Sequence, residues 1–188
     1  MAGSEIMDSS ARVQHDNVHA LGALAAIEQL EADFAYRLDH EAGAGIDELF
    51  SRGGEYTIDS ATLRGRDAIR RAYAARSGMG PRTVRHLFVN SRLGRLTERE
   101  CWRQSVLILF GGDGVPVLPL SPPLAISDVD DHFVRTDNGW RFKSRTLTTV
   151  FRGDGKIVSP HSAGDGPTVT AQPEAGGIAP ASAGPQHT

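Results

Sequence analysis

A histidine inside a predicted strand and an acid at the end of a predicted helix are the residues of this sequence best suited to move a proton. His86 lies in "TVRHLFVN", on the same strand face as Val84 and Phe88. An imidazole titrates near neutral pH and acts as a general base when a carboxylate orients it. Asp39 ends the helix in "AYRLDHEAG", where unpaired carbonyl groups disfavour an acid. We therefore consider Asp39 as the carboxylate that orients His86.

Both residues also have an interpretation that involves no chemistry. His86 can be a core histidine that bonds Asn90 or a backbone carbonyl group. Asp39 can be an exposed acid at a frayed helix end. The spacing of the two residues does not decide between these interpretations and a catalytic pair.

Two arginines and the single cysteine have structural interpretations as well. Arg145 in "WRFKSRTL" alternates with Arg141 and Lys143, and such alternation is typical of a solvated strand face. Arg103 in "CWRQS" has the same interpretation. Cys101 is expected to be a small buried residue, because nothing near it in the sequence marks a lowered pKa.

Known metal and cofactor motifs are absent from the sequence. "DHEAG" and "DVDDH" combine acids with histidine, but neither matches a zinc HExxH motif or an EF-hand loop. We interpret "DVDDH" as a strand with solvent-facing acids. There is no GxGxxG, no P-loop and no GxSxG nucleophile elbow. We expect no metal and no organic cofactor.

Composition and charge indicate one ordinary globular domain. The 188 residues are 39% hydrophobic and 23% charged. The net charge of -3 argues against nucleic acid as a partner. One cysteine precludes an internal disulfide, and no apolar run is long enough for a membrane. We expect no signal peptide, because residues 1–10 have neither a basic nor an apolar region. We expect a cytoplasmic protein without a membrane partner.

Composition changes along the chain predict three regions. Residues 1–17 are polar and are predicted to form a flexible arm. Residues 18–155 form the domain. Residues 156–188 are rich in Pro, Gly and Ala and contain no Leu, Phe, Tyr or Trp, so we predict a disordered tail.

Periodicity predicts helices first and strands afterwards, which is an α+β arrangement. Helical spacing runs over 18–40, followed by a short turn at 46–50, a strand in "EYTID" and a helix in "RGRDAIRRAYAARSG". Four segments then alternate with period two: "RTVRHLFVNSRL", "RECWRQSVLILF", "LAISDVDDHFVRT" and "GWRFKSRTLTTVF". Asp137-Asn138, with Gly139 next, predicts a hairpin between the last two strands. A strongly bent antiparallel sheet around the long helix would leave an internal pocket.

The same segments resemble a known family. "AAIEQLEADFAYRLD", "TIDSATLRGRDAIRRAY", "RHLFVN" and "DHFVRTDNGWRFKSRTL" occur in the order found in the SnoaL-like branch of the nuclear transport factor 2-like superfamily. The resemblance covers nearly all of residues 20–152. It implies a cone-shaped α+β barrel with a deep pocket.

Within that superfamily the chain is most similar to lyases such as lindane dehydrochlorinase, bile acid 7-alpha-dehydratase and scytalone dehydratase. By this resemblance Asp39 and His86 match the catalytic pair, and Arg145 matches a pocket arginine of the dehydrochlorinase. Ser60 and Arg103 occupy places where scytalone dehydratase has a tyrosine and a second histidine, which argues against the scytalone reaction itself.

We therefore expect a cofactor-independent lyase or isomerase that acts on a small apolar, cyclic or polyketide-like compound. His86, oriented by Asp39, would abstract a proton, and Arg145 would stabilise negative charge. Further residues expected at the substrate are Tyr36, Tyr56, Phe88, Trp102 and Arg103. Members of this superfamily commonly assemble through the exposed sheet face, so a homodimer or homotrimer is expected.

Two alternatives remain open at the level of sequence. The first is a non-catalytic binding or assembly module, similar to the small subunits of ring-hydroxylating dioxygenases. The second is an epoxide hydrolase, because limonene epoxide hydrolase activates water with an Asp-Arg-Asp set. For this second reaction the sequence offers Asp39 and one arginine but places no second acid.

Overall fold

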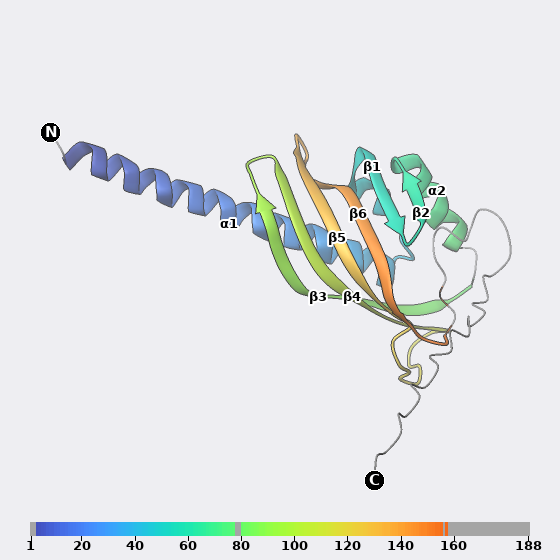
Figure 1. The fold of residues 1–188 in the computed structure, drawn as a ribbon. Coiled ribbons are helices and arrows are strands. Elements are labelled where there is room, and N and C mark those ends of the chain that lie inside the picture. Colours follow the sequence, from blue (N-terminus) through green and yellow to red (C-terminus); the bar gives the residue numbers. More distant parts are fainter. Residues whose placement is uncertain (1–2, 78–79, 156, 158–188) are drawn as a thin grey trace, which may run out of the picture.

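The computed structural model describes residues 3–77, 80–155 and 157 of the chain, with side chains described from Val18 onward except at 76–77. Two helices and one 3-10 turn accompany six strands (Figure 1). In chain order the elements are α1 (Gly3–His40), η1 (Ile46–Leu49), β1 (Phe50–Ile58), β2 (Ala61–Arg64), α2 (Arg66–Ser77), β3 (Arg82–Leu96), β4 (Glu100–Asp113), β5 (Ala125–Thr136) and β6 (Gly139–Arg152).

The six strands form one curved sheet that does not close, in the order β2-β1-β6-β5-β4-β3. The α+β prediction is confirmed, and α1 crosses the concave face of the sheet (Figure 1). The predicted antiparallel pairing holds for every pair of neighbouring strands except one, because β1 runs parallel to β6. The sheet is therefore mixed, and β3 is an edge strand.

The core lies between α1 and the concave face of the sheet. Ile27, Leu30, Phe34 and Leu38 are at most 6% exposed and recur at helical spacing along α1. The ring of Phe34 meets the rings of Phe50, Tyr56, Phe88 and Phe142 edge-on, with centroids 5.6–6.2 Å apart. Such contacts add to the stabilisation from burial alone. The middle of the cone is thus filled with aromatic side chains.

Helix α1 is longer than the sequence indicated. It begins at Gly3 rather than near Val18, so it includes most of the segment 1–17 that we predicted as a flexible arm. The tail predicted for residues 156–188 lies outside the described residues, apart from Ile157.

A β-bulge in β6 changes which side chains of that strand face inward. Asp131 of β5 pairs with Arg145, whereas Phe133 pairs with Phe142, so Lys143 is an extra residue on β6. Phe142 and Arg145 are consequently both 0% exposed. Strict alternation had placed Arg145 on a solvated face, and that interpretation is wrong.

The predicted orientation of the acids in "DVDDH" is also wrong in one case. Asp128 and Asp130 are exposed, but Asp131 is only 3% exposed. The hairpin predicted at Asp137-Asn138 does join β5 to β6, and Gly139 has a φ of 91°.

Candidate functional site

Asp39 and His86 lie in contact at the junction of α1 and β3. Oδ1 of Asp39 is 2.7 Å from Nδ1 of His86. The backbone N–H of His86 also donates to the same carboxylate, with 3.2 Å from the nitrogen to each oxygen. The two side chains are 8% and 9% exposed, respectively. A carboxylate held by this many donors has little freedom to reorient, and it fixes the imidazole in turn.

The edge position of β3 explains why this contact forms. Leu109 of β4 is the cross-strand partner of His86. Its carbonyl, however, accepts from the N–H of Leu124, on the β5 side, and not from the N–H of His86. The backbone N–H of His86 therefore points away from the sheet, towards α1. An unpaired N–H on an edge strand needs an acceptor. Asp39 supplies that acceptor, which also accounts for an acid at the end of this helix.

The end of α1 is held by a turn that only certain residues can form. Ala42 and Gly43 adopt φ values of 53° and 84°, and the N–H of Gly43 donates to the carbonyl of Arg37. A Cβ added at Gly43 would lie 2.2 Å from the ring of Tyr73. Glycine is therefore required here, and α1 ends where Asp39 can reach β3.

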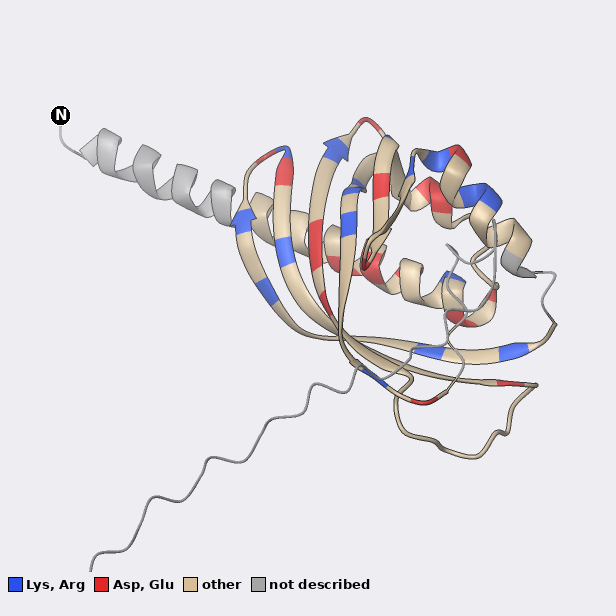
Figure 2. Cartoon of the chain, turned by 45° about the vertical axis from the view of Figure 1, so that its right-hand side comes forward, with Lys and Arg blue, Asp and Glu red and all other residues tan. Residues whose placement is uncertain are grey.

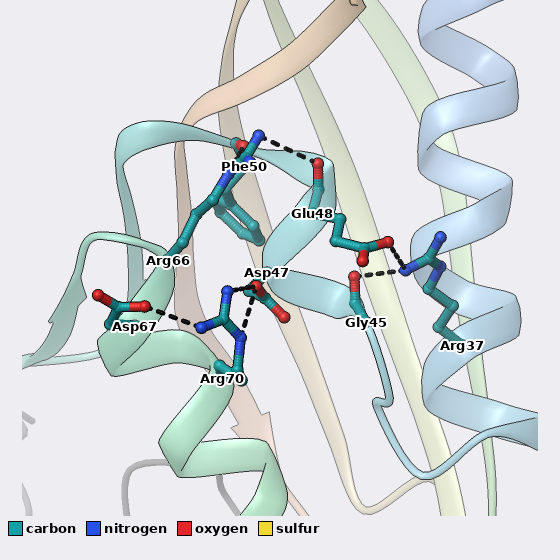
Figure 3. A network of polar contacts seen from close by, with 8 residues as sticks. All are labelled: Arg37, Gly45, Asp47, Glu48, Phe50, Arg66, Asp67 and Arg70. Atoms are coloured by element: carbon teal, nitrogen blue, oxygen red, sulfur yellow. Dashed lines mark hydrogen bonds and ion pairs between the residues drawn. The ribbon is translucent and has the colours of Figure 1, made fainter.

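Arginines from both helices hold the 3-10 segment that follows this turn (Figure 3). Arg37 of α1 bonds the carbonyl of Gly45 and the carboxylate of Glu48. Arg70 of α2 binds Oδ2 of Asp47 with Nε and Nη2 at 3.1 and 2.6 Å. The hydrogen bond and charge of Asp47 raise the pKa of Arg70. These contacts fix the segment that follows the end of α1 between the two helices.

Asp39 lines a cavity of about 630 Å³ at the end of the cone. One side of the cavity is formed by the end of α1 and the turn after it, through Leu38, Asp39, His40 and Ala42. Residues 80–85, which lead into β3 and begin it, form another side, and residues 114–116 of the β4–β5 loop form the rim. The volume suits a small organic ligand. The cavity reaches the pair on its Asp39 side, and neither His86 nor Arg145 is among its lining residues.

Arg145 is itself fully buried and belongs to a separate ion cluster. Its Nε and Nη2 bind the two oxygens of Asp131 at 2.8 and 2.6 Å, and Nη2 also lies 2.9 Å from Oε1 of Glu31. Glu31 in turn contacts Arg103, with 3.2 Å from Oε2 to Nη1. The cluster thus contains two cations and two carboxylates. Its charges balance inside the core, as burial requires.

Burial and ion pairing shift the pKa values of Arg145 and Glu31 in opposite directions. Burial alone would lower the pKa of Arg145, but the charge and hydrogen bonds of Asp131, followed by the charge of Glu31, outweigh it and raise that pKa. Burial raises the pKa of Glu31, and Arg145 opposes the rise. The Arg145 guanidinium also lies 4.3–4.4 Å from the ring centroids of Phe34, Phe88 and Phe142. It is a permanent cation in an aromatic cage.

The other residues expected at the substrate lie in several places. Tyr36 is 57% exposed and stacks on His40, whereas Tyr56 is 3% exposed within the aromatic core. Phe88 packs against Arg145, and Arg103 pairs with Glu31. Trp102 stacks on His132 on the outer face of the sheet, with 4.2 Å between ring centroids. The structure brings none of these side chains to the lining of the Asp39 cavity.

Sequence reasoning missed Glu31, Asp131 and Arg82, although the sequence does contain a signal for Glu31. Glu31 lies four residues after Ile27 and three before Phe34, so it is an acid within the apolar stripe of α1. Asp131 had no such signal, because its neighbours Asp128 and Asp130 are exposed. Arg82 is recognisable as a candidate only from its place on the cavity wall.

Two further kinds of site are absent from the described residues. No group of three or more His, Cys, Asp or Glu side chains in this part of the chain could hold a metal ion. No helix in the same part of the chain is long and apolar enough to cross a membrane.

Comparison with known proteins assigns the fold to a family. The model of the SnoaL-like domain matches residues 19–146, which include both Asp39 and His86. The chain belongs to the SnoaL-like family. No curated protein shows significant sequence similarity to this member of the family.

Solved structures support the assignment at the level of fold. A candidate scytalone dehydratase from Novosphingobium aromaticivorans is 23% identical, with a TM-score of 0.64 over 76% of this chain and 94% of that one. ActVI-ORFA from Streptomyces coelicolor is 18% identical, with a TM-score of 0.58 over 69% and 98%. A protein from Catenulispora acidiphila in complex with S-DNPA is 20% identical, with a TM-score of 0.57 over 67% and 94%. These likenesses place the SnoaL-like chain in the nuclear transport factor 2-like fold.

Proposed function

We propose that this SnoaL-like protein is a cofactor-independent lyase or isomerase of the dehydratase type, acting on a small cyclic or polyketide-like compound. The observation that carries the proposal is the 2.7 Å contact between a buried carboxylate and an imidazole beside a cavity of about 630 Å³. Similarity to a candidate scytalone dehydratase, and to a protein that binds S-DNPA, supports a small organic substrate.

The reaction would begin with transfer of a proton from a substrate carbon to Nε2 of His86. Nδ1 bonds Asp39, so Nε2 would be the nitrogen that takes the proton. The positive charge gained by the ring would be balanced by the Asp39 carboxylate. The electron pair left on the substrate would either form a double bond as a β-substituent leaves or be reprotonated at another carbon. The first outcome is a lyase reaction and the second an isomerisation.

We assign Arg145 to the core rather than to the reacting atoms. It is 0% exposed, holds two carboxylates and lies outside the lining of the cavity. A cation already paired in this way has little capacity to stabilise new negative charge on a substrate. The transition state would then rely on the Asp39–His86 pair and on groups of the adjacent cavity wall.

Isotope exchange tests proton abstraction even while the complete reaction is unidentified. A panel of cyclic and polyketide-like ketones with acidic C–H groups would be incubated with the protein in deuterated water and followed by NMR. We expect Asp39→Asn and His86→Gln to lower the exchange rate by at least about a hundredfold. Arg64→Gln, which removes an exposed ion pair with Glu55, is the matched control. Unchanged exchange in both pair variants would refute the proposal.

A non-catalytic binding module is the main alternative, and the filled core favours it. Phe34, Phe88 and Phe142 enclose Arg145 where a deeper pocket would otherwise extend. A module would bind the same ligands as an enzyme but leave them chemically unchanged. Saturable binding without exchange or turnover in the wild-type protein would support this alternative.

The ion cluster provides an observation in favour of epoxide hydrolysis as a further alternative. Arg145 lies between Asp131 and Glu31, which provides the second acid that the sequence did not place. An acid–arginine–acid set of this kind would activate water rather than abstract a carbon-bound proton. Epoxide opening that survives Asp39→Asn but is lost in Glu31→Gln would favour this reaction over the Asp39–His86 lyase.

We also propose that the chain forms a homodimer or homotrimer through the outer face of the sheet. Leu87, Ile108, Ile126 and Phe151 are successive cross-strand partners on β3, β4, β5 and β6. Leu87 is 45% and Phe151 65% exposed. A continuous apolar row with exposed ends is typical of a surface that a second copy covers.

A further inference from the structure

We propose that the ligand of the Asp39 cavity is an anion whose acidic group binds at Arg82, roughly the length of an aromatic acid away from the Asp39–His86 pair. The inference names a substrate class and therefore rests on the cavity used in the proposed function. Neither the family model nor the structural neighbours assign such a site to this chain.

Arg82 is the most enclosed of the cations on the cavity wall. Its side chain is 13% exposed, and it lines the cavity together with Asp39. Nη1 of Arg82 lies 2.6 Å from Oδ1 of Asp113, which is itself 72% exposed. The cation is therefore inside and its carboxylate partner outside. A guanidinium carries five N–H donors, and a ligand carboxylate or sulfonate would compete for them with Asp113 and with the other contacts of Arg82.

Basic side chains outnumber acids among the described residues that line the cavity. Strand β3 carries four arginines and no acidic residue, as its colouring in Figure 2 shows. Of these arginines, Arg82 and Arg85 line the cavity, and His40 adds a third basic side chain across from them. Asp39 is the only acid among the described lining residues, and it is engaged by His86. A ligand entering past β3 therefore meets positive charge first.

The opposite wall, at the end of α1, carries the acid Asp39 beside the basic His40. The C-terminal end of α1 presents partial negative charge, and the carboxylate of Asp39 lies in the same place. An anionic group would be repelled from that wall and attracted to Arg82. The polarised cavity would therefore bind a substrate in one orientation, with the acidic group at β3 and a C–H group at the pair.

The length of β3 sets the size of such a ligand. Arg82 and His86 are four residues apart on an extended strand, which corresponds to roughly 13 Å between their Cα atoms. The side chains of Arg82 and His86 extend from these Cα atoms, so we infer a shorter apolar body, about the length of two fused rings, for a substrate that contacts both. This agrees with the mixed polar and apolar wall of a cavity of about 630 Å³.

Two fluorescent dyes that differ only in their charge test the inference. Anilinonaphthalene sulfonate is an aromatic anion, and phenylnaphthylamine is the same skeleton without the sulfonate. We expect the full chain to bind the anion at least about tenfold more tightly than the neutral dye. The difference should shrink as salt is added, because the attraction is between charges.

Three variants locate the bound anion. Arg82→Gln should weaken binding of the sulfonate about tenfold and leave the neutral dye unchanged. Asp113→Asn should strengthen binding of the sulfonate, because Arg82 loses the carboxylate that competes for it. Arg64→Gln, on β2 and outside the cavity lining, should change neither dye. An opposite response to Arg82→Gln and Asp113→Asn would be difficult to obtain by partial unfolding.

Three results would overturn the inference: equal affinity for both dyes, binding of the sulfonate that is insensitive to Arg82→Gln, or no binding of either dye. The second result would indicate dye bound elsewhere, such as on the outer face of the sheet. None of these results bears on proton abstraction, which the exchange rates of the Asp39 and His86 variants test separately.

Discussion

The Asp39 carboxylate binds His86 at two of its groups, with 2.7 Å from Oδ1 to ring Nδ1 and 3.2 Å from each oxygen to the backbone nitrogen. The same side chain therefore terminates an unpaired edge of the sheet and orients an imidazole. A structural role and a proposed catalytic role coincide in one residue. Tests of the site have to separate the geometry of this contact from its charge.

The tautomer of His86 is the first prediction. An ionised carboxylate can only accept hydrogen bonds, so neutral His86 should carry its proton on Nδ1 and leave Nε2 as the acceptor. Nitrogen chemical shifts of the labelled imidazole, assigned with His86→Gln, would measure this. In Asp39→Asn the new amide can accept from the backbone and donate to the ring, so the proton should move to Nε2. A proton on Nε2 in the wild-type protein would contradict the prediction.

The second prediction concerns the stability of the buried ion cluster. Arg145→Leu would leave Glu31 and Asp131 close together in the core, with Arg103 as the remaining cation. We expect the free energy of unfolding to fall by about 3–5 kcal/mol, measured by urea denaturation. The exposed pair removed by Arg64→Gln should cost less than about 1 kcal/mol. Equal losses in the two variants would show that the cluster contributes no more than a surface pair.

The third prediction is that Cys101 is chemically inert in the folded chain. The side chain is 0% exposed. Burial raises the pKa of its thiol, Arg103 opposes that rise and Asp131 adds to it. A raised pKa lowers the fraction of reactive thiolate at any pH below it. Ellman's reagent should therefore label the native protein very slowly at mildly alkaline pH and label one thiol per chain after denaturation. Labelling of the native chain as fast as free cysteine would contradict this.

The fourth prediction concerns assembly. The wild-type protein should have a mass in solution that is a multiple of 20.2 kDa, measured by light scattering during gel filtration. Phe151→Asp places a charge at the exposed end of the apolar row and should shift the mass to that of one chain. Val115→Asp, at a 68% exposed position on the β4–β5 loop, is the matched control. A monomeric wild-type protein would show that the row has no second copy as partner.

The elements that sequence predicted well are those governed by local patterns. Alternation over "RTVRHLFVNSRL" and the Asn-Gly signal at residues 138–139 depend on neighbouring residues, and the strand and the hairpin both form there. The parallel pairing of β1 with β6 joins residues that are far apart in the chain, such as Tyr56 and Arg145. No local pattern encodes that contact.

The candidate site was predictable only where a local sequence pattern marks one of its residues. A single extra residue, Lys143, turns Arg145 into the core, and periodicity cannot reveal a bulge of this kind. A buried acid such as Asp131 is understandable only beside its cation, which lies on another strand. Asp39 stands out in the sequence because an acid at a helix end conflicts with the helix dipole. Such a local conflict is visible before the partner of the acid is identified.

The closed edge of β3 has a consequence for the behaviour of the chain at high concentration. An edge strand with bare N–H and C=O groups is a template on which another molecule can add a strand. On β3 the N–H of His86 is occupied by Asp39, and the carbonyl of Val84 accepts from Nη1 of Arg85 at 2.7 Å. Asp39 thus removes one backbone N–H of the sheet edge from those to which another strand could pair, in addition to orienting the ring of His86.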